Sequence, residues 1–535
     1  MTGSAGRQRK WNGWGYEGDE IPPEQIKRWM AGAGAWLGVQ PEERQMPVPL
    51  ERLVIPPSRV DLQIPGFEGR IARSPYERAL HGAGRSYGDL IRLRTGEGLR
   101  FPDGVAYPAT EADLLRLMDH AAAHRIALIP FGGGSSVVGG VEPSAGPGYQ
   151  GVISVDLQLL SRLREVDALS RRVRVEAGML GPDLEESLRE HGLAFRHYPQ
   201  SYQHSTVGGW VAARAGGHFS TRHAKIDSRV EALRVVTPAG VVQTREVPAS
   251  ASGPSGNGLF VGSEGSLGFI TEAVLQALLP PVRKLAAGYR YPDFAAGLEA
   301  MRRVVQAGLQ PPVLRLLDEY EAMVAAMTQG RRYQPGALLL LGFEIDAESA
   351  AGRVEAEWQE ARRLCLAAGG EPTGEEEVRT WKSTYFEQPY WRDVLIDYGL
   401  IVDTLETAAT WSRAEAMYQG VRTALLERLD RWSPGGGVLC RVTHVYPDGC
   451  SLYFSFFARP DRERLLEAWR DLQLAALEAF LAHGGTLSHH HGTGQDFQPL
   501  FEREHGAVHL QALRGLKAAL DPGGVMNPSV FFGPR

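Results

Sequence analysis

Three glycine-dense segments constrain what this chain can fold into more than any other feature of its sequence. They read PFGGGSS at 130–136, QSYQHSTVGGWVAARAGG at 200–217 and GSEGSLG at 262–268, and each contains serine or threonine. Glycine allows close backbone approach and positive φ, so several amide N–H groups can converge on an anion. The first segment has neither the lysine of a P-loop nor the GxGxxG spacing. Together the segments indicate a backbone surface that contacts a long, polar cofactor such as a dinucleotide.

The pattern around these segments predicts an α+β fold rather than a doubly wound one. Thr110 begins a predicted helix at 111–124, and Asp113 stands where a capping box needs an acidic side chain. Predicted strands occupy residues 125–130, 152–157 and 172–177, and a hairpin is predicted at 235–243. These helices and strands mix without a strict βαβ repeat, which favours α+β.

Composition and periodicity divide the chain into four segments, which we predict at 1–97, 98–282, 283–488 and 489–535. The first is an arm with helical and irregular structure, and its aromatic cluster indicates packing on a folded body: Trp11, Trp14, Tyr16 and Trp29. The pattern changes near Pro280-Pro281, after which we expect a second α+β domain of antiparallel strands with helices on one face. The last segment is expected to return to the first domain.

Charge and cysteine content exclude several classes of protein. The chain has 57 basic and 63 acidic side chains, a net charge of -6, so it has no overall electrostatic attraction to nucleic acid. Its cysteines, Cys365, Cys440 and Cys450, cannot form a disulfide framework and suit a reducing compartment. With no signal peptide and no membrane-length apolar run, we expect a cytoplasmic protein. Peripheral contact with the inner face of a membrane stays open.

The order of strand, GGGSS loop, STVGGW segment and GSEGSLG turn is similar to the FAD-binding domain of the vanillyl-alcohol-oxidase (PCMH-type) superfamily. Within it, the chain resembles the alkyldihydroxyacetonephosphate synthase family nearly end to end. The strings that carry the resemblance are RKWNGWGYEGDE, SYQHSTVGGWVAARA, GSEGSLGFITEA, LRLLD, DTLETAATW, CRVTHVY, SLYF, GGTLSHHHGTG and LDPGGVMNPSVFF. The resemblance implies a PCMH-type FAD-binding domain at 98–282 and a substrate-binding cap at 283–488.

The resemblance implies FAD that is bound without a covalent link. Its pyrophosphate would lie on the backbone of Pro130, Phe131, Gly132, Gly133, Gly134, Ser135 and Ser136. The remainder of FAD would be lined by Gln200, Ser201, Tyr202, Gln203, His204, Ser205, Thr206, Ala213, Arg214, Ala215, Gly216, Glu264, Gly265, Ser266, Leu267, Gly268, Phe269 and Ile270. The chain departs from the family pattern at Gln203-His204, at 218–228 and at 84–89, all near the expected flavin site.

The implied activity exchanges the acyl chain of an acyl-dihydroxyacetone phosphate for a long-chain fatty alcohol, as in ether-lipid synthesis, with no net redox change of FAD. Tyr453 matches the family's proton-transfer tyrosine, Arg315 and Arg441 match its substrate-site arginines, and His489, His490 and His491 match its essential histidine run. No metal is implied. Long-chain substrates would need an apolar tunnel that opens toward a membrane surface.

Each of these residues also has a structural interpretation. Tyr453 lies in an aromatic strand and is a core residue by pattern alone. The arginines lie in apolar strands, where a structural carboxylate would serve as well as a ligand. In an extended segment His489 and His491 would share one face and His490 the other. Metal binding by this run lacks an obvious third ligand, so we favour substrate hydrogen bonding and proton shuttling over a metal site or a structural cluster.

Two rival functions share the glycine-dense segments. One is an FAD-dependent oxidase or dehydrogenase of 2-hydroxy acids such as D-lactate or glycolate, which could use the histidines for a metal. The other is a non-catalytic flavin-binding scaffold or lipid-binding partner, against which the ionisable residues of the second domain argue. The sequence leaves a homodimer open.

Overall fold

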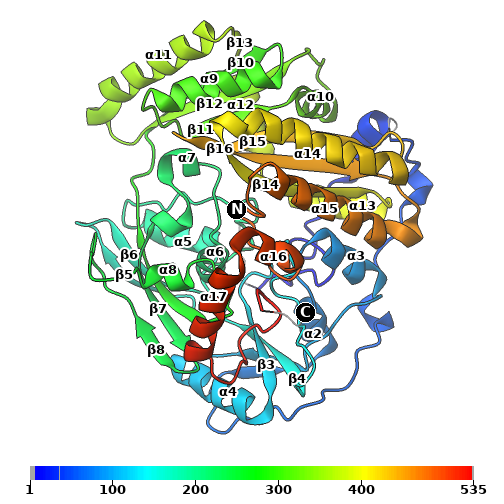
Figure 1. The fold of residues 1–535 in the computed structure, drawn as a ribbon, viewed down its shortest axis with the longest axis vertical. Coiled ribbons are helices and arrows are strands. Elements are labelled where there is room, and N and C mark those ends of the chain that lie inside the picture. Colours follow the sequence, from blue (N-terminus) through cyan, green and yellow to red (C-terminus); the bar gives the residue numbers. More distant parts are fainter. Residues whose placement is uncertain (1–5, 35–36, 533–535) are drawn as a thin grey trace.

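The computed structural model describes residues 6–34 and 37–532, so the outer ends of the first and last predicted segments, 1–5 and 533–535, lie outside the described residues. The described residues form three sheets, of four, five and seven strands. In Figure 1 the seven-stranded sheet and its helices lie above the two smaller sheets. The prediction of an α+β fold is confirmed.

The N-terminal arm packs on the body of the protein through its aromatic side chains. Trp11, Trp14, Tyr16 and Trp29 are all buried. Most of the arm's path is irregular, because proline and glycine recur along it. Its helical elements are α1 (Pro23–Trp29), η1 (Met30–Gly34), η2 (Pro41–Glu43) and η3 (Leu50–Arg52).

The four-stranded sheet has the order β1-β2-β4-β3, with β1 antiparallel and the others parallel. Its strands are β1 (Arg70–Ala72), β2 (Gly104–Tyr107), β3 (Ile126–Phe131) and β4 (Gly151–Asp156). Its helices are α2 (Pro75–Leu80), α3 (Tyr87–Thr95) and α4 (Glu111–His124). The capping box between Thr110 and Asp113 forms as predicted. Strand β1 lies in the segment predicted as an arm, and it joins the sheet by pairing with β2.

The five-stranded sheet is antiparallel, in the order β5-β6-β9-β7-β8. Its strands are β5 (Leu163–Asp167), β6 (Arg172–Glu176), β7 (Val230–Thr237), β8 (Gly240–Gln243) and β9 (Phe269–Gln276). Its helical elements are α5 (Gly181–Arg189), α6 (Val207–Ala213), α7 (Ser220–His223), η4 (Ile226–Ser228) and α8 (Asn257–Phe260). The two smaller sheets share one hydrophobic core, so they form a single structural unit.

The cap is built on the seven-stranded antiparallel sheet, ordered β13-β10-β12-β11-β15-β16-β14. Its strands are β10 (Arg283–Tyr291), β11 (Val313–Leu317), β12 (Ala337–Ile345), β13 (Glu371–Gly374), β14 (Ile401–Thr410), β15 (Gly437–Tyr446) and β16 (Gly449–Ala458). Its helical elements are α9 (Phe294–Gln306), α10 (Glu319–Thr328), η5 (Glu348–Ala350), α11 (Ala351–Ala367), α12 (Glu376–Thr384), α13 (Gln388–Asp397), α14 (Trp411–Trp432), η6 (Arg462–Arg464) and α15 (Leu465–Ala482).

Helices cover both faces of the cap sheet, whereas we predicted helices on one face. Strand β12 is buried along its whole length, and its side chains alternate between two cores. Leu339 and Leu341 pack in the core that contains α9, α11 and α14. Leu338 and Leu340 pack instead with Ala322 of α10 and Val378 of α12. A strand buried on both faces reads as a continuous apolar run, so its sequence does not reveal the second helical layer.

The C-terminal segment runs back along the lower domain through α16 (Gln498–His505) and α17 (Ala507–Leu520), drawn in red in Figure 1. The N–H of Leu128 donates to the carbonyl of Val525, and the N–H of Asn527 donates to the carbonyl of Leu128. The Asn527 amide also donates to the carbonyl oxygens of Gly140 and Glu264. Within residues 6–34 and 37–532, no helix combines the length and apolar character needed to cross a membrane.

A buried ion pair joins the lower domain to the cap, between Arg196 and Glu344 of β12. Burial would raise the pKa of Glu344, but the neighbouring His223, whose Nε2 lies 3.9 Å away, and the charge of Arg196 outweigh it and lower that pKa to about 2. The folded pKa lies below the usual value of 4.5, so the pair stabilises the fold above pH 4.5. This stabilisation is lost as the pH falls toward 2.

We therefore expect Glu344→Gln to lower the free energy of unfolding by about 3 kcal/mol at pH 7, because it leaves a buried guanidinium without its carboxylate. The deficit should shrink as the pH falls from 4.5 toward 2. Denaturant unfolding at several pH values measures both effects. The exposed pair of Arg353 with Glu357 is a matched control, and Glu357→Gln should cost about 0.5 kcal/mol or less. Equal deficits for the two variants would contradict the prediction.

Candidate active site

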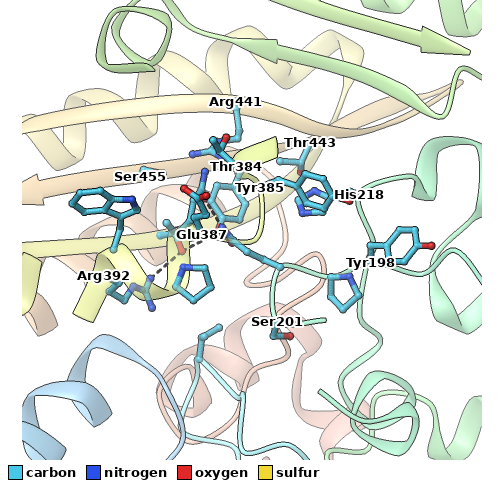
Figure 2. Close-up of a pocket in the computed structure, with 18 of the residues that line it drawn as sticks. Tyr198, Ser201, His218, Thr384, Tyr385, Glu387, Arg392, Arg441, Thr443 and Ser455 are labelled. Carbon is cyan, nitrogen blue, oxygen red and sulfur yellow. Dashed lines mark hydrogen bonds between the residues drawn. The ribbon is translucent and has the colours of Figure 1, made fainter. Parts of the chain in front are cut away.

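A cavity of about 1460 Å³ lies between the lower domain and the cap. Figure 2 shows its middle part, with Tyr198 and Ser201 on the lower domain and Arg441 and Thr443 on cap strand β15. The three glycine-dense segments form the wall on the lower domain, and β11, β15 and β16 contribute the opposite wall. One continuous space therefore joins the glycine-dense segments to the ionisable residues of the cap.

The loop after β3 presents bare backbone to this cavity. A Cβ atom on Gly132 would lie 2.3 Å from Thr206 Oγ1, and one on Gly133 would lie 1.7 Å from the carbonyl oxygen of His204. Only glycine fits where these two segments touch. Among the residues that the structure describes, none accepts a hydrogen bond from the N–H groups of residues 132–137. Unpaired amides beside a cavity suit an anionic group such as a pyrophosphate, so the loop fits FAD.

Most residues predicted to contact FAD line this cavity. They are Pro130, Phe131, Gly132, Gly133, Gly134, Ser135, Ser136, Gln200, Ser201, Ser205, Thr206, Ala213, Ala215, Gly216, Glu264, Gly265, Gly268, Phe269 and Ile270. In contrast to the prediction, the following do not line it: Tyr202, Gln203, His204, Arg214, Ser266 and Leu267.

The residues outside the lining support the wall from behind. Tyr202 and Leu267 are buried in the hydrophobic core of the lower domain. The Ser266 hydroxyl donates to the carbonyl of Ser263, and Arg214 ends α6 in a left-handed conformation and pairs with Asp227.

The departure at Gln203-His204 forms a contact between the lower domain and the cap. The Tyr390 hydroxyl donates to Gln203 Oε1 at 3.2 Å, and His204 Nε2 lies 2.9 Å from the same hydroxyl. The His204 ring also contacts the rings of Trp14 and Tyr16 from the arm. Burial lowers the pKa of His204 to about 3, so the ring is neutral at pH 7. These two residues therefore join the arm, the lower domain and the cap.

The arm holds the glycine loop from its outer side. The Arg9 guanidinium donates to the carbonyl oxygen of Gly133 and lies over the Phe131 ring. All described peptide bonds are trans, so the N–H of Gly134 points opposite to that carbonyl. Arg85 fixes the arm in turn by donating to the carbonyl oxygens of Gly13 and Lys10. The arm is distant from this loop in sequence, but it helps to orient the backbone amides of the loop.

We expect Arg9→Gln to weaken FAD binding about tenfold, because the Gly133 peptide loses the charged donor that orients it. Titration of FAD into the apoprotein, followed by flavin fluorescence, measures the change in Kd. Arg7 is the matched control, since it pairs with Asp19 within the arm. An unchanged Kd for Arg9→Gln, or an equal loss for Arg7→Gln, would refute this role of the arm.

Arg315 and Arg441 lie on neighbouring cap strands and line the cavity as a pair. Arg315 Nη2 lies 2.8 Å from His218 Nδ1, and Arg441 Nε lies 2.7 Å from a carboxylate oxygen of Glu321. Burial and the charge of Arg441 lower the pKa of Arg315 to about 9, so the Arg315 guanidinium stays charged at pH 7. Among the described residues, Glu321 is the only carboxylate that pairs with the two guanidinium groups, so this part of the site can accept a second anion.

His218 takes a defined tautomer beside Arg315. A guanidinium only donates, so His218 Nδ1 accepts and the ring proton lies on Nε2. Burial, together with the charge of Arg315, holds the pKa of His218 well below 6.5. The ring is therefore neutral. Sequence reasoning did not select this residue, and its only signal was its place in the segment that departs from the family pattern.

Tyr453 lines the cavity from β16, between the arginines and the histidine run. Its hydroxyl donates to Thr404 Oγ1 at 3.0 Å, and the Arg441 guanidinium lies 5.2 Å from its ring centre. Burial raises the pKa of Tyr453, while Arg441 and the Thr404 hydrogen bond act in the opposite direction. The structure therefore places this hydroxyl in the cavity rather than in the core. Its role in proton transfer stays a prediction.

The histidine run is bent, so the alternation of faces that an extended segment would give does not apply to it. His490 stacks on the Tyr453 ring at 6.0 Å, and His491 meets the same ring edge-on at 5.7 Å. His489 turns away from the cavity lining, and its Nε2 lies 2.6 Å from the Tyr446 hydroxyl. Consecutive histidines thus share one aromatic partner, which a flat strand would not permit.

Folding brings further potential metal ligands, His444 and Glu406, close to the histidine run. Potential ligand atoms of His444, His489 and His490, and those of Glu406, His490 and His491, lie within 4.8 Å of one another. The oxygens of Glu406 already accept hydrogen bonds from the chain itself. His444 Nε2 lies 3.1 Å from the carbonyl oxygen of Gly217, which accepts its proton. The existing hydrogen bonds thus occupy atoms that a metal ion would need.

Arg392 is a further cation that sequence reasoning missed. It extends from α13 toward the cavity in Figure 2, and its Nη2 donates to Asp403 at 2.7 Å and to Thr404 at 3.4 Å. Because Thr404 also accepts from Tyr453, these hydrogen bonds connect Arg392 to the tyrosine. An arginine in an ordinary amphipathic helix gives no sequence signal for such a position.

Two family models match successive parts of the chain. The model described as FAD binding domain matches residues 102–245, and the model described as FAD linked oxidases, C-terminal domain, matches residues 280–530. With the amide-lined cavity, these matches define an FAD-dependent flavoprotein of the FAD-linked oxidase class.

Three comparisons narrow this class. An alkyldihydroxyacetonephosphate synthase of Trypanosoma brucei brucei is 31% identical over 576 residues, which cover 99% of this chain and 93% of that protein. An alkyldihydroxyacetonephosphate synthase of Dictyostelium discoideum is 27% identical over 473 residues, which cover 84% of this chain and 76% of that protein. A solved alkyldihydroxyacetonephosphate synthase structure shares the fold, with a TM-score of 0.80 at 23% identity over 97% of this chain and 98% of that one. The chain belongs to the alkyldihydroxyacetonephosphate synthase family and is an enzyme with FAD as its cofactor.

Proposed function

We propose that the protein exchanges the acyl chain of an acyl-dihydroxyacetone phosphate for a long-chain fatty alcohol. The observation that carries this proposal is the single cavity that joins the amide-lined loop to Arg315, Arg441 and Tyr453. In the reaction the ester's fatty acid leaves, the alcohol oxygen forms a bond to the same carbon, and the alcohol loses its proton. Bound FAD supplies an electron-accepting ring that activates the dihydroxyacetone unit without net redox change.

Each side chain of the cap has a part in this reaction. The guanidinium groups of Arg315 and Arg441 bind the phosphate, because a planar donor fork matches its oxygens. The Tyr453 hydroxyl moves the alcohol's proton: burial raises its pKa, and the charge of Arg441 beside its ring limits that rise. The neutral imidazoles of His490 and His491 accept that proton or orient the substrate.

FAD itself is held without a covalent bond, so acid precipitation should release all flavin into the supernatant.

The aliphatic chains would enter beside the arm. Trp29 and Leu37 near α1, and Ala325 and Met327 of α10, extend the cavity lining away from the charged residues. Arg28 and Arg331 lie in the same part of the lining, so the entrance combines apolar and basic groups. This supports a cytoplasmic enzyme that contacts the inner face of a membrane peripherally. Co-sedimentation with anionic vesicles, compared with zwitterionic ones, tests the contact.

The decisive experiment incubates the holoenzyme anaerobically with acyl-dihydroxyacetone phosphate and labelled hexadecanol. We expect labelled ether product and release of one fatty acid per ether bond, while the oxidised flavin spectrum recovers fully. Absence of ether product, with intact FAD and intact fold, would refute the proposal.

A 2-hydroxy-acid oxidoreductase is the alternative. The clustering of His444, His489 and His490 favours it, because a metal held there could bind a hydroxy acid. It predicts that D-lactate or glycolate bleaches the flavin in the absence of oxygen. Bleaching without ether formation would select this alternative over the synthase.

A further inference from the structure

Glu406 is a buried carboxylate within the string DTLETAATW, and neither the sequence analysis nor the proposed reaction gives it a role. It lies on β14 directly opposite Tyr453 on β16, and it is 2% exposed. Among the described residues, no lysine or arginine forms an ion pair with it. A buried charge without a cationic partner is costly unless hydrogen bonds satisfy it.

The histidine run supplies those hydrogen bonds through its backbone. Glu406 Oε2 accepts from the N–H of His489 at 2.6 Å, and Oε1 accepts from the N–H groups of His490 and His491, each at 3.0 Å. The Ser488 hydroxyl donates to Oε1 at 2.8 Å. Successive amides that converge on one anion form a nest, and this geometry bends the chain. The convergence of these N–H groups on Glu406 explains why the histidine run is bent rather than extended.

The same carboxylate lies close to two of the imidazole rings. The Nδ1 atoms of His490 and His491 are 3.5 Å and 3.6 Å from its oxygens. Both rings contact Tyr453, so a single carboxylate fixes their backbone and faces their side chains. The Glu406 carboxylate opposes the lowering of the His491 pKa by burial, as an acidic partner favours the proton on a histidine in a catalytic triad.

We propose that Glu406 is the positioning residue of the active site, which folds the histidine run around its carboxylate and thereby sets His490 and His491 against Tyr453. This inference rests on the proposed function where it concerns catalysis. The bent geometry itself does not depend on which reaction the enzyme performs, so it can be tested separately.

The first test measures geometry without turnover. Glu406→Gln keeps the side-chain shape but replaces one acceptor oxygen by a donor, which must face a backbone N–H. In the holoenzyme we expect diethylpyrocarbonate to modify the peptide that carries residues 489–491 at least about fivefold faster than in the wild type, because nest and bend are lost. Peptide mass spectrometry measures the rates. An unchanged rate would overturn the proposal.

Glu504 provides the matched control. It accepts hydrogen bonds from the Thr486 hydroxyl and the Leu487 N–H, so it anchors the chain just before the run but contacts none of the rings. Glu504→Gln should leave the modification rate within about twofold of the wild type. Equal acceleration in both variants would reduce Glu406 to a general chain anchor and refute its specific role.

The second test is a double-mutant cycle on ether formation. We expect Glu406→Gln to lower kcat about 30-fold and to change the KM for acyl-dihydroxyacetone phosphate by less than about threefold, because it touches no substrate. Added to Tyr453→Phe, it should cost less than about threefold more, since both act on one step. Multiplying losses would indicate a general structural defect and contradict the proposal.

Two other results can arise, one in the wild type and one in the Glu406→Gln variant. If the wild type forms no ether product, the proposed function fails, while the modification rates still decide the role of Glu406. If Glu406→Gln does not fold with FAD, Ser488→Ala replaces it, because the Ser488 hydroxyl donates to Glu406 and accepts from the N–H of His491. This milder change should accelerate modification about twofold or more. No acceleration would count against the proposal.

Discussion

Tyr453→Phe is expected to reduce the rate of ether formation about 10³-fold while FAD stays bound, because it removes the hydroxyl that carries the proton. The fold should survive, since the ring keeps its contacts with His490 and His491. Thr404 loses one hydrogen-bond partner but retains that of Arg392, which limits the cost in stability. Product formation from labelled hexadecanol and the flavin-to-protein absorbance ratio measure the two effects.

Tyr291 is the control for this substitution. It is also a buried cap tyrosine with a hydroxyl bonded at 3.0 Å, to the carbonyl of Cys365, but it does not line the cavity. Tyr291→Phe should therefore keep activity within about twofold of the wild type. Full activity in Tyr453→Phe would show that another group carries the proton.

Gly133→Ala is expected to weaken FAD binding at least about 100-fold, or roughly 3 kcal/mol, because it separates two walls of the cofactor site. The added Cβ would lie 1.7 Å from the His204 carbonyl oxygen and 2.8 Å from Ser205 Cα. Both contacts are with backbone, so rotation of a side chain cannot relieve them. The amides of residues 132–137 would then lose their common direction. Flavin content after purification and reconstitution of the apoprotein measure the effect.

Gly515 offers the matching control. It lies in helix α17, and a Cβ atom there meets no heavy atom within 4 Å. Gly515→Ala should bind FAD with unchanged affinity and gain up to about 1 kcal/mol in stability, since alanine is the better helix former. If Gly133→Ala also bound FAD normally, the close contact between the two segments would not be required for the cofactor site.

The sequence predicted the local elements well where one periodic signal determined them. The capping box at Thr110 and the helix at 111–124 are examples, because caps and apolar spacing are local properties. It did not reveal α10 and α12 on the second face of the cap sheet. A strand buried on both faces has no alternation, so the sequence of β12 could not show that another helical layer covers it.

The candidate site divides in the same way. The glycine-dense segments predicted an exposed backbone surface, and residues of all three segments line the same cavity. Arg9 and Glu406 lie in strings that carry the resemblance, but no pattern indicated the role of either residue or of Arg392, because a charged residue in an arm, a helix or a strand has many ordinary uses. Arg9 and Glu406 find their partners more than 80 positions away along the chain, such as Gly133 for Arg9. Arg392 is connected to Tyr453 only through Thr404. Sequence spacing carries no information about such contacts.

The sequence by itself determined the α+β architecture through its apolar periodicity. It determined the FAD class and the family through its resemblance to family strings such as SYQHSTVGGWVAARA and GGTLSHHHGTG. Only the tertiary structure decided how the histidine run bends, which carboxylate holds it and that the arm supports the cofactor loop. The physical reason is that a buried charge must find its hydrogen-bond partners in space. The folded chain brings those partners from distant segments.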